Sequence, residues 1–135
     1  MNTDNDITQA RILVVDDEPI NLILMEEILD EDGFNNVIYL DDPVKAIENY
    51  RTETIDLILL DLKMPVMNGY EFIQEIHGLT KKAPPILVLT ASADNETHDK
   101  VLNANAQGII SKPFDIDEVL TEIKKMITEY WATDN

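Results

Sequence analysis

The sequence contains no cysteine, which excludes disulfide frameworks, zinc–thiolate sites, iron–sulfur clusters and cysteine nucleophiles. Basic residues are also scarce, since 10 Lys and Arg stand against 27 Asp and Glu, for a formal net charge of -17. Phosphate backbones and anionic lipids repel so acidic a chain. We therefore expect no direct binding to nucleic acid or to membranes.

Long apolar segments, targeting signals and glycine-rich loops are missing as well. No apolar run approaches the ~20 residues that cross a bilayer, and the N-terminal residues MNTDNDITQAR lack both the basic and the apolar region of a signal peptide. The four glycines form neither GxGxxG nor a Walker loop, which argues against nucleotide or flavin binding. These absences favour a soluble, cytoplasmic protein.

The 135 residues suffice for one domain with its own apolar core, since 44% of them are hydrophobic. No linker composition and no internal repeat divides the chain. We expect an N-terminal tail over residues 1–10, a single folded domain over 11–131 and a C-terminal tail over 132–135.

Short apolar runs rich in β-branched residues alternate with segments of helical spacing. Continuous apolar runs are typical of parallel strands covered on both faces by helices. The pattern predicts a doubly wound, flavodoxin-like α/β fold with five parallel strands in the common order 2-1-3-4-5. Strands are expected at residues 12–15, 37–40, 55–60, 86–89 and 108–111, and helices at 19–29, 43–50, 70–76, 94–106 and 116–130.

Polar residues follow four of the predicted strands. Asp16 and Asp17 follow the first strand, Asp61 the third, Thr90 the fourth and Lys112 the fifth. The carboxyl ends of parallel strands meet at one edge of the sheet, and ligands bind there at the point where strand order reverses. Because the predicted order places strands one and three side by side, the three aspartates are expected within a few ångströms of one another.

Three carboxylates this close repel one another and stay ionised only with a cation among them. Hard oxygen ligands suit Mg²⁺, which combines one or two carboxylates with phosphate oxygens and water. The Lys112 ammonium and the Thr90 hydroxyl approach the same point, as a transferring phosphoryl group requires. The residues alone therefore predict Mg²⁺-assisted phosphoryl chemistry on a carboxylate.

The same segments carry a family resemblance. Asp16-Asp17-Glu18-Pro19, the run DLKMPVMNG at 61–69, Thr90-Ala91 and Lys112-Pro113-Phe114 together resemble the receiver domain of two-component response regulators. The match extends from about Arg11 to about Trp131 and covers nearly the whole chain.

The resemblance implies a role for each motif residue in the metal site. Asp61 is implied as the phosphoacceptor, and Asp17 and Asp61 as direct Mg²⁺ ligands. Asp16 is implied to act mainly through water, and the backbone carbonyl of Lys63 to complete the protein ligands.

Further roles are implied for the last two strand ends. Thr90 would bind the phosphoryl oxygens, Lys112 would pair with the acceptor and its phosphoryl group, and Pro113 would follow a cis peptide bond. One position departs from the family, since Ile109 occupies the place of a frequent aromatic residue. A switch that buries or exposes an aromatic ring is therefore not expected.

The function implied is a signalling switch that accepts a phosphoryl group from a partner phosphohistidine. The partner would be a sensor histidine kinase or a histidine phosphotransfer protein, and the target downstream is unknown. We expect the signal on the surface of helix four, strand five and helix five, around Lys100, Ile109 and Lys124. Self-phosphorylation and slow dephosphorylation are expected in place of enzymatic turnover.

Two other functions remain as alternatives. One is a Mg²⁺-dependent small-molecule phosphatase on a similar scaffold. Phosphatases of the haloacid-dehalogenase type, however, need an Asp-x-Asp motif after the first strand, whereas Asp16 and Asp17 are adjacent. The other is a receiver-like module that only binds proteins, against which the complete set of pocket residues argues. Of the remaining candidates, Asp41 and Asp42 are expected to cap a helix.

Overall fold

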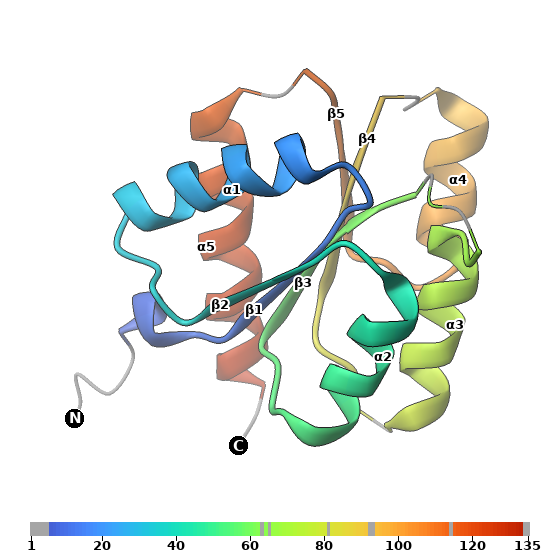
Figure 1. Ribbon diagram of the computed structural model, residues 1–135, viewed down its shortest axis with the longest axis horizontal. Helices are drawn as coiled ribbons and strands as arrows, with labels where there is room; N and C mark the ends of the chain where they lie inside the picture. The colour runs from blue at the N-terminus through green and yellow to red at the C-terminus, as the bar shows by residue number, and fades with distance from the viewer. Residues whose placement is uncertain are drawn as a thin grey trace.

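The computed structural model describes residues 6–62, 64, 66–80, 82–91, 94–113 and 115–133. Its centre is a parallel sheet of five strands in the order β2-β1-β3-β4-β5, which confirms the predicted fold (Figure 1). The strands are β1 (Ile12–Val15), β2 (Val37–Leu40), β3 (Leu57–Asp61), β4 (Ile86–Thr90) and β5 (Gly108–Ser111).

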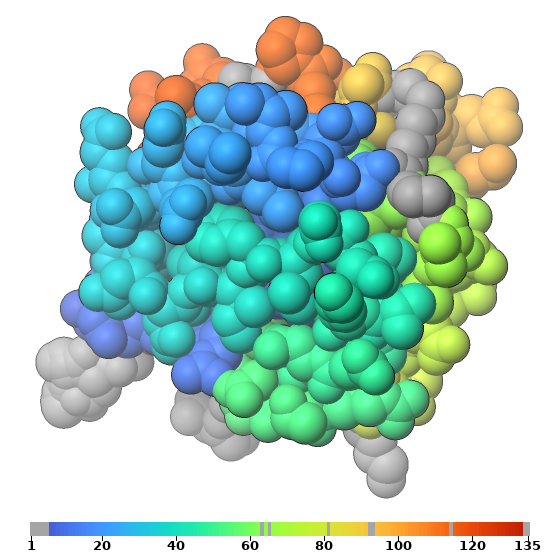
Figure 2. Space-filling model, in the orientation of Figure 1, coloured from blue at the N-terminus to red at the C-terminus, as the bar shows by residue number. Residues whose placement is uncertain are grey.

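Helices cover both faces of the sheet, with α1 and α5 on one side and α2, α3 and α4 on the other (Figure 1). Within the described residues these are α1 (Pro19–Glu31), α2 (Pro43–Thr52), α3 (Gly69–Leu79), α4 (Asn95–Asn103) and α5 (Ile116–Ala132). The segment from α1 to α2, which includes the edge strand β2, fills the near side of the molecule in Figure 2. None of the described helices is long and apolar enough to span a membrane.

The apolar core consists of two layers, because alternate residues of each strand face opposite sides of the sheet. Leu13 and Val15 pack toward α2 and α3, whereas Ile12 and Val14 pack toward α1 and α5. The three central strands β1, β3 and β4 are buried along their full length. Their burial fixes the register that brings the strand ends into line.

Side-chain caps fix where the helices begin at the carboxyl end of the sheet. Asp42 accepts hydrogen bonds from the Val44 and Lys45 amides, so the expected capping role of the Asp41-Asp42 pair falls to Asp42. Asn68 and Glu71 form a reciprocal capping box at the start of α3. The Asp94 and Asp115 side chains cap α4 and α5 by accepting hydrogen bonds from backbone amides of the first turn.

The packed part of the chain begins before Arg11. Ile7–Gln9 forms a short 3-10 helix, η2, that Asp6 caps through the Thr8 amide. Ile7 packs against the layer beneath α1 and α5, and Ala10 is fully buried there. Residues 6–10, which belong to the expected N-terminal tail, are thus in contact with the domain.

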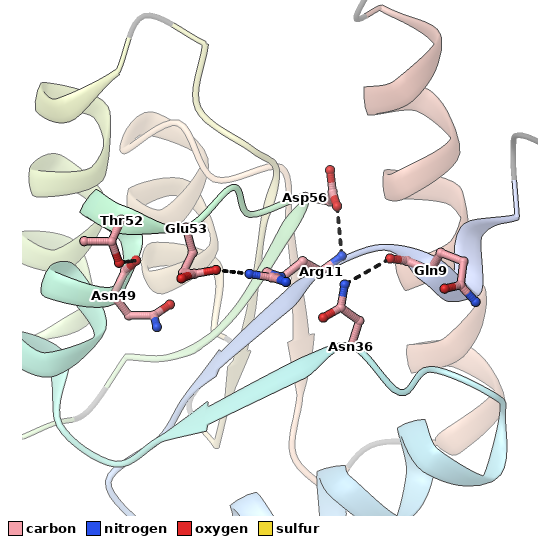
Figure 3. A network of polar contacts seen from close by, with 7 residues as sticks. All are labelled: Gln9, Arg11, Asn36, Asn49, Thr52, Glu53 and Asp56. Atoms are coloured by element: carbon pink, nitrogen blue, oxygen red, sulfur yellow. Dashed lines mark hydrogen bonds and ion pairs between the residues drawn. The ribbon is translucent and has the colours of Figure 1, made fainter.

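A polar network ties elements together at the amino end of the sheet (Figure 3). Asp56, directly before β3, accepts a hydrogen bond from the Arg11 amide at 2.8 Å and one from the Trp131 indole at 3.0 Å. The Arg11 guanidinium pairs with Glu53. Because Asp56 faces the start of β1, β3 begins at Leu57 and not at Ile55, where the apolar run begins.

Candidate functional site

The three predicted carboxylates converge at the carboxyl ends of β1 and β3. These strands are neighbours with Val15 opposite Leu60, so Asp16 and Asp61 follow at the same level. One carboxylate oxygen from each of Asp16, Asp17 and Asp61 lies within 4.8 Å of the others. Asp16 and Asp61 are only 7% and 9% exposed, so water screens their mutual repulsion weakly.

Lys112 reaches the same cluster from the end of β5. Its Nζ lies 3.2 Å from Asp16 Oδ2 and 4.0 Å from Asp61 Oδ1. Its backbone amide donates to the Thr90 carbonyl at 2.7 Å, which continues the β4–β5 pairing beyond Ser111. Lys112 thus lies beside two of the three carboxylates, and among the described residues the acids of the cluster outnumber this ammonium.

The backbone around Asp16 holds its carboxylate in place. Asp16 Oδ1 accepts a hydrogen bond from the Glu18 amide at 2.9 Å, and Oδ2 faces Lys112. Pro19 then begins α1, where the missing amide of proline costs no helical hydrogen bond. The Asp16 side chain is therefore oriented before any ligand arrives.

Thr90 is the last residue of β4 and is 1% exposed. It lies between the two strands that carry Asp61 and Lys112, since β4 pairs with β3 on one side and with β5 on the other. Its expected contact with a phosphoryl group stays a prediction. The Lys112–Pro113 peptide bond is cis, as the family resemblance implied.

The loop after Asp61 depends on Gly69. Its amide donates to the Leu62 carbonyl at 2.9 Å, and a Cβ at this position would lie 2.8 Å from the Leu62 Cα. Only glycine allows α3 to begin so close to the backbone behind Asp61. The expected metal ligand Lys63 lies outside the described residues.

Comparison with known proteins assigns the chain to a family. Residues 12–124 match the model of the response regulator receiver domain. The chain belongs to this family. The chemotaxis protein CheY of Bacillus subtilis is 32% identical over 117 residues, which cover 87% of this chain and 97% of CheY.

Other relatives place receiver domains in larger proteins. Response regulator ArlR of Staphylococcus saprophyticus is 37% identical over 120 residues, and the match covers 87% of this chain and 52% of ArlR. The receiver domain of the sensor histidine kinase PA1611 from Pseudomonas aeruginosa superposes with a TM-score of 0.80 at 29% identity, over 89% of this chain and 98% of that one. That structure has a magnesium ion coordinated in its active-site cleft.

The carboxylate cluster of this receiver domain fits a Mg²⁺ ion. Its donors are hard oxygens, and within the part of the chain that the structure describes three carboxylates gather beside the Lys112 ammonium. Opposite ligands of a Mg²⁺ octahedron lie about 4 Å apart, slightly closer than the 4.8 Å that encloses the three carboxylate oxygens. Only a small adjustment would bring these oxygens within reach of one ion.

One residue expected on the signalling surface lies elsewhere. Lys124 pairs with Asp32 at the end of α1, at 2.9 Å, so it faces α1 and not α4. Helical spacing in α5 indicated which residues are buried but not which neighbour the exposed ones meet. Lys100 and Ile109 remain on α4 and β5, where Ile109 packs against the layer beneath α2, α3 and α4.

Proposed function

We propose that this receiver domain is a phosphoacceptor switch in which Asp61 takes a phosphoryl group from a partner phosphohistidine with the help of Mg²⁺. The observation that carries the proposal is the convergence of Asp16, Asp17 and Asp61 within 4.8 Å, beside the Lys112 ammonium. The family match and the magnesium in a related receiver support it.

The reaction is a displacement at phosphorus. An Asp61 carboxylate oxygen forms the new O–P bond while the N–P bond of the phosphohistidine breaks, and its electron pair stays on the ring nitrogen. Lys112 lies close enough to pair with the transferred phosphoryl oxygens, and Thr90 donates to them from the end of β4. As the family resemblance implies, Asp17, Asp61 and the Lys63 carbonyl would hold Mg²⁺ directly and Asp16 would hold it through water. Bound Mg²⁺ offsets the charge on the phosphoryl oxygens.

A protein donor must cover the rim of this site, and exposed apolar side chains gather there. Ile20, Ile23 and Leu24 lie in the first half of α1, directly after Asp17, and are about half exposed or more. Val66 lies between β3 and α3 and Ile116 is the first residue of α5, both at the same end of the sheet, and Val66 is 91% exposed. Exposed apolar groups that cluster in this way mark interaction sites. We assign this rim to the sensor kinase or phosphotransfer protein that supplies the phosphoryl group.

The labelling experiment uses a small donor, so it needs no knowledge of the partner. With acetyl phosphate and Mg²⁺, the protein gains one phosphoryl group, which mild base or hydroxylamine removes because acyl phosphates are labile. Asp61→Asn prevents the gain, whereas Asp56→Asn, a matched change before the same strand, permits it. A stable label, or one that persists in Asp61→Asn, overturns the proposal. Absence of p-nitrophenyl phosphate turnover separates the switch from a phosphatase.

The phosphoryl group is read on α4, β5 and α5. It adds roughly two negative charges at the end of β3, and the adjacent Thr90 leads directly toward α4. This helix buries Val101 as its single fully buried side chain among the described residues, so it shifts at least cost. Beryllofluoride should therefore change hydrogen exchange in the described parts of residues 91–106. Changes confined to α1 and α2 would contradict this readout.

A further inference from the structure

A pocket lies at the amino end of the sheet, on the opposite side of the molecule from the carboxylate cluster. It is lined by residues within 50–55, at the end of α2 and before β3, by residues within 79–84, at the end of α3 and before β4, and by Tyr130 of α5. We call it the amino-end pocket, and its volume is about 430 Å³. Small-molecule sites typically have volumes of about 300–1,000 Å³. The whole length of β3 separates this pocket from Asp61, so the two are distinct sites.

The described lining of the amino-end pocket is positively charged, although the chain as a whole is strongly acidic. It contains two cations, Arg51 and Lys82, and one acid, Glu53. Glu53 pairs with the Arg11 guanidinium, which comes from outside the lining (Figure 3). Arg51 forms no ion pair with any residue that the structure describes. In a protein of net charge -17, a pocket of this sign favours an anion over a neutral ligand.

Two tyrosines give the amino-end pocket an aromatic wall. Lys82 Nζ lies 5.1 Å from the centre of the Tyr130 ring, within the range of a cation–π contact. This contact places an ammonium beside an aromatic ring at the same pocket. Tyr50 also lines the pocket, and its hydrogen bond with Thr80 ties α2 to the end of α3. Tyrosine rings pack against other flat rings in offset or edge-to-face arrangements, so this wall suits a ligand with an aromatic body.

A neighbouring pocket on Tyr130 has the opposite charge. Its charged side chains are those of Glu122, Lys125 and Glu129 on α5, so acids outnumber the cation among its described residues. The two pockets share Tyr130 and differ in the sign of their lining. The charges around the tyrosine therefore distinguish the amino-end pocket as the one that suits an anion.

We propose that the amino-end pocket binds a small organic anion in which a carboxylate or a phosphate is attached to a flat aromatic ring. The charged group of the ligand pairs with Arg51 and Lys82, because guanidinium and ammonium groups bind both kinds of anion. The ring of the ligand packs against Tyr50 and Tyr130. Neither contact involves the carboxylate cluster, so binding requires neither Mg²⁺ nor phosphoryl transfer.

The first experiment varies the ligand, by titration calorimetry of the full chain in Mg²⁺-free buffer. 2-Naphthoate and 2-naphthyl phosphate carry both ring and charge, 2-naphthalenemethanol carries only the ring, and inorganic phosphate carries only the charge. We expect both ring anions to bind at least about tenfold more tightly than the other two probes, the scale of one hydrogen bond to a charged group. The tighter of the two ring anions identifies the charged group of the ligand. Equal affinity for 2-naphthoate and 2-naphthalenemethanol overturns the proposal, as does absence of binding by both ring anions at millimolar concentration.

The second experiment varies the protein. Arg51→Gln and Lys82→Gln should each weaken 2-naphthoate binding about fivefold, the upper scale for an ion pair of an exposed cation. Lys125→Gln removes the same charge from the neighbouring pocket and is the matched control, with an expected change below about twofold. Equal weakening in all three variants would contradict the proposal, because net charge alone would then explain the binding.

The third measurement locates the ligand. Amide chemical shifts of the full chain should change on addition of 2-naphthoate mainly in the described parts of residues 50–55 and 79–84. Changes centred on the carboxylate cluster or on the neighbouring pocket would overturn the assignment. These experiments contain neither Mg²⁺ nor a phosphodonor, so their outcome is independent of whether Asp61 accepts a phosphoryl group.

Discussion

Strand β3 has an aspartate at each end, and the two have opposite surroundings. Asp56 precedes the strand and receives hydrogen bonds from the Arg11 amide and the Trp131 indole. Asp61 ends the strand and faces two further carboxylates, with Lys112 at 4.0 Å. Hydrogen-bond donors thus meet the first carboxylate, whereas other carboxylates crowd the second. Asp56 therefore serves stability, whereas the surroundings of Asp61 suit the binding and phosphoryl chemistry that we propose for it.

The difference extends to the surfaces around the two residues. At the amino end, cations and donors match the acids, as in the pair of Arg11 with Glu53 (Figure 3). At the carboxyl end, acids crowd, apolar side chains are exposed and Val66 adopts a left-handed backbone with φ of 71°. Unfavourable features of this kind, such as crowded charges and a strained backbone, are typical of functional sites when they occur together. A cation and a partner protein would relieve them.

Replacing each of the two aspartates with alanine should produce the largest contrast in the free energy of unfolding. Asp56→Ala leaves the Arg11 amide and the Trp131 indole without their acceptor and should lower the free energy of unfolding by about 2–3 kcal/mol. Asp61→Ala removes a repelled charge and should leave that free energy unchanged or raise it by about 1 kcal/mol in Mg²⁺-free buffer. Urea denaturation measures both. The comparison fails if Asp61→Ala destabilises as much as Asp56→Ala.

Magnesium should stabilise the protein through the carboxyl end alone. At a concentration 100 times its dissociation constant, a ligand of the native state adds ~2.7 kcal/mol. We expect this gain in the wild type and in Asp56→Asn, and its loss in Asp17→Ala. Urea denaturation at several Mg²⁺ concentrations measures the effect. An undiminished gain in Asp17→Ala would locate the ion elsewhere.

The backbone of Val66 offers a smaller and purely local test. A β-branched residue at φ of 71° is strained, whereas asparagine tolerates that region, as Asn105 does at φ of 72°. Val66→Asn should raise the free energy of unfolding by about 1 kcal/mol, and Asn105→Val should lower it by a similar amount. Thermal unfolding of both variants checks the pair. Equal effects of the same sign would show that backbone strain is not the cause.

Two tyrosines report the charge of their surroundings with the smallest expected effect. Burial, together with the charges of Glu26 and Asp30 on α1, raises the pKa of Tyr39 to about 12. Burial also raises the pKa of Tyr50, with no acid among the causes, while its hydrogen bond with Thr80 lowers it. Added salt should therefore lower the pKa of Tyr39 and leave that of Tyr50 unchanged. Tyrosinate absorbance in Tyr39→Phe and Tyr50→Phe assigns the two titrations.

The raised pKa of Tyr39 makes the stability of the protein depend on pH. A folded pKa of about 12 for Tyr39, above the ordinary 10.0, means that the folded protein keeps a proton that the unfolded chain loses. The contribution of Tyr39 to stability is complete below pH 10 and is lost as the pH rises through about 12. Urea denaturation across this range should show a weaker decline in Tyr39→Phe.

The fold and the carboxylate cluster follow from the sequence because they depend on local patterns and one topological rule. Continuous apolar runs indicated parallel strands, and the shared edge of their carboxyl ends placed Asp16, Asp17 and Asp61 together. The role of Asp56 was not predicted, since it lies within an apolar run and its partner Trp131 is 75 residues away. Such a contact depends on the path of the whole chain.

Lys124 and Asn21 show that the sequence is equally limited in predicting which neighbours a helical residue meets. The apolar period of α5 identifies its buried side, yet the pairing of Lys124 with Asp32 depends on how α5 crosses α1. Asn21 is one polar residue in an apolar stretch of α1, and only the packed structure shows that it lines the same pocket as Lys112.

Chemical trapping tests the central claim, that Asp61 and no neighbouring acid accepts the phosphoryl group. The protein is phosphorylated with acetyl phosphate and Mg²⁺, reduced with borohydride, which converts an acyl phosphate to an alcohol, and digested for tandem mass spectrometry. The account predicts homoserine at position 61, with Asp16, Asp17 and Asp56 unchanged. Homoserine at any of those three positions, with Asp61 intact, would contradict it.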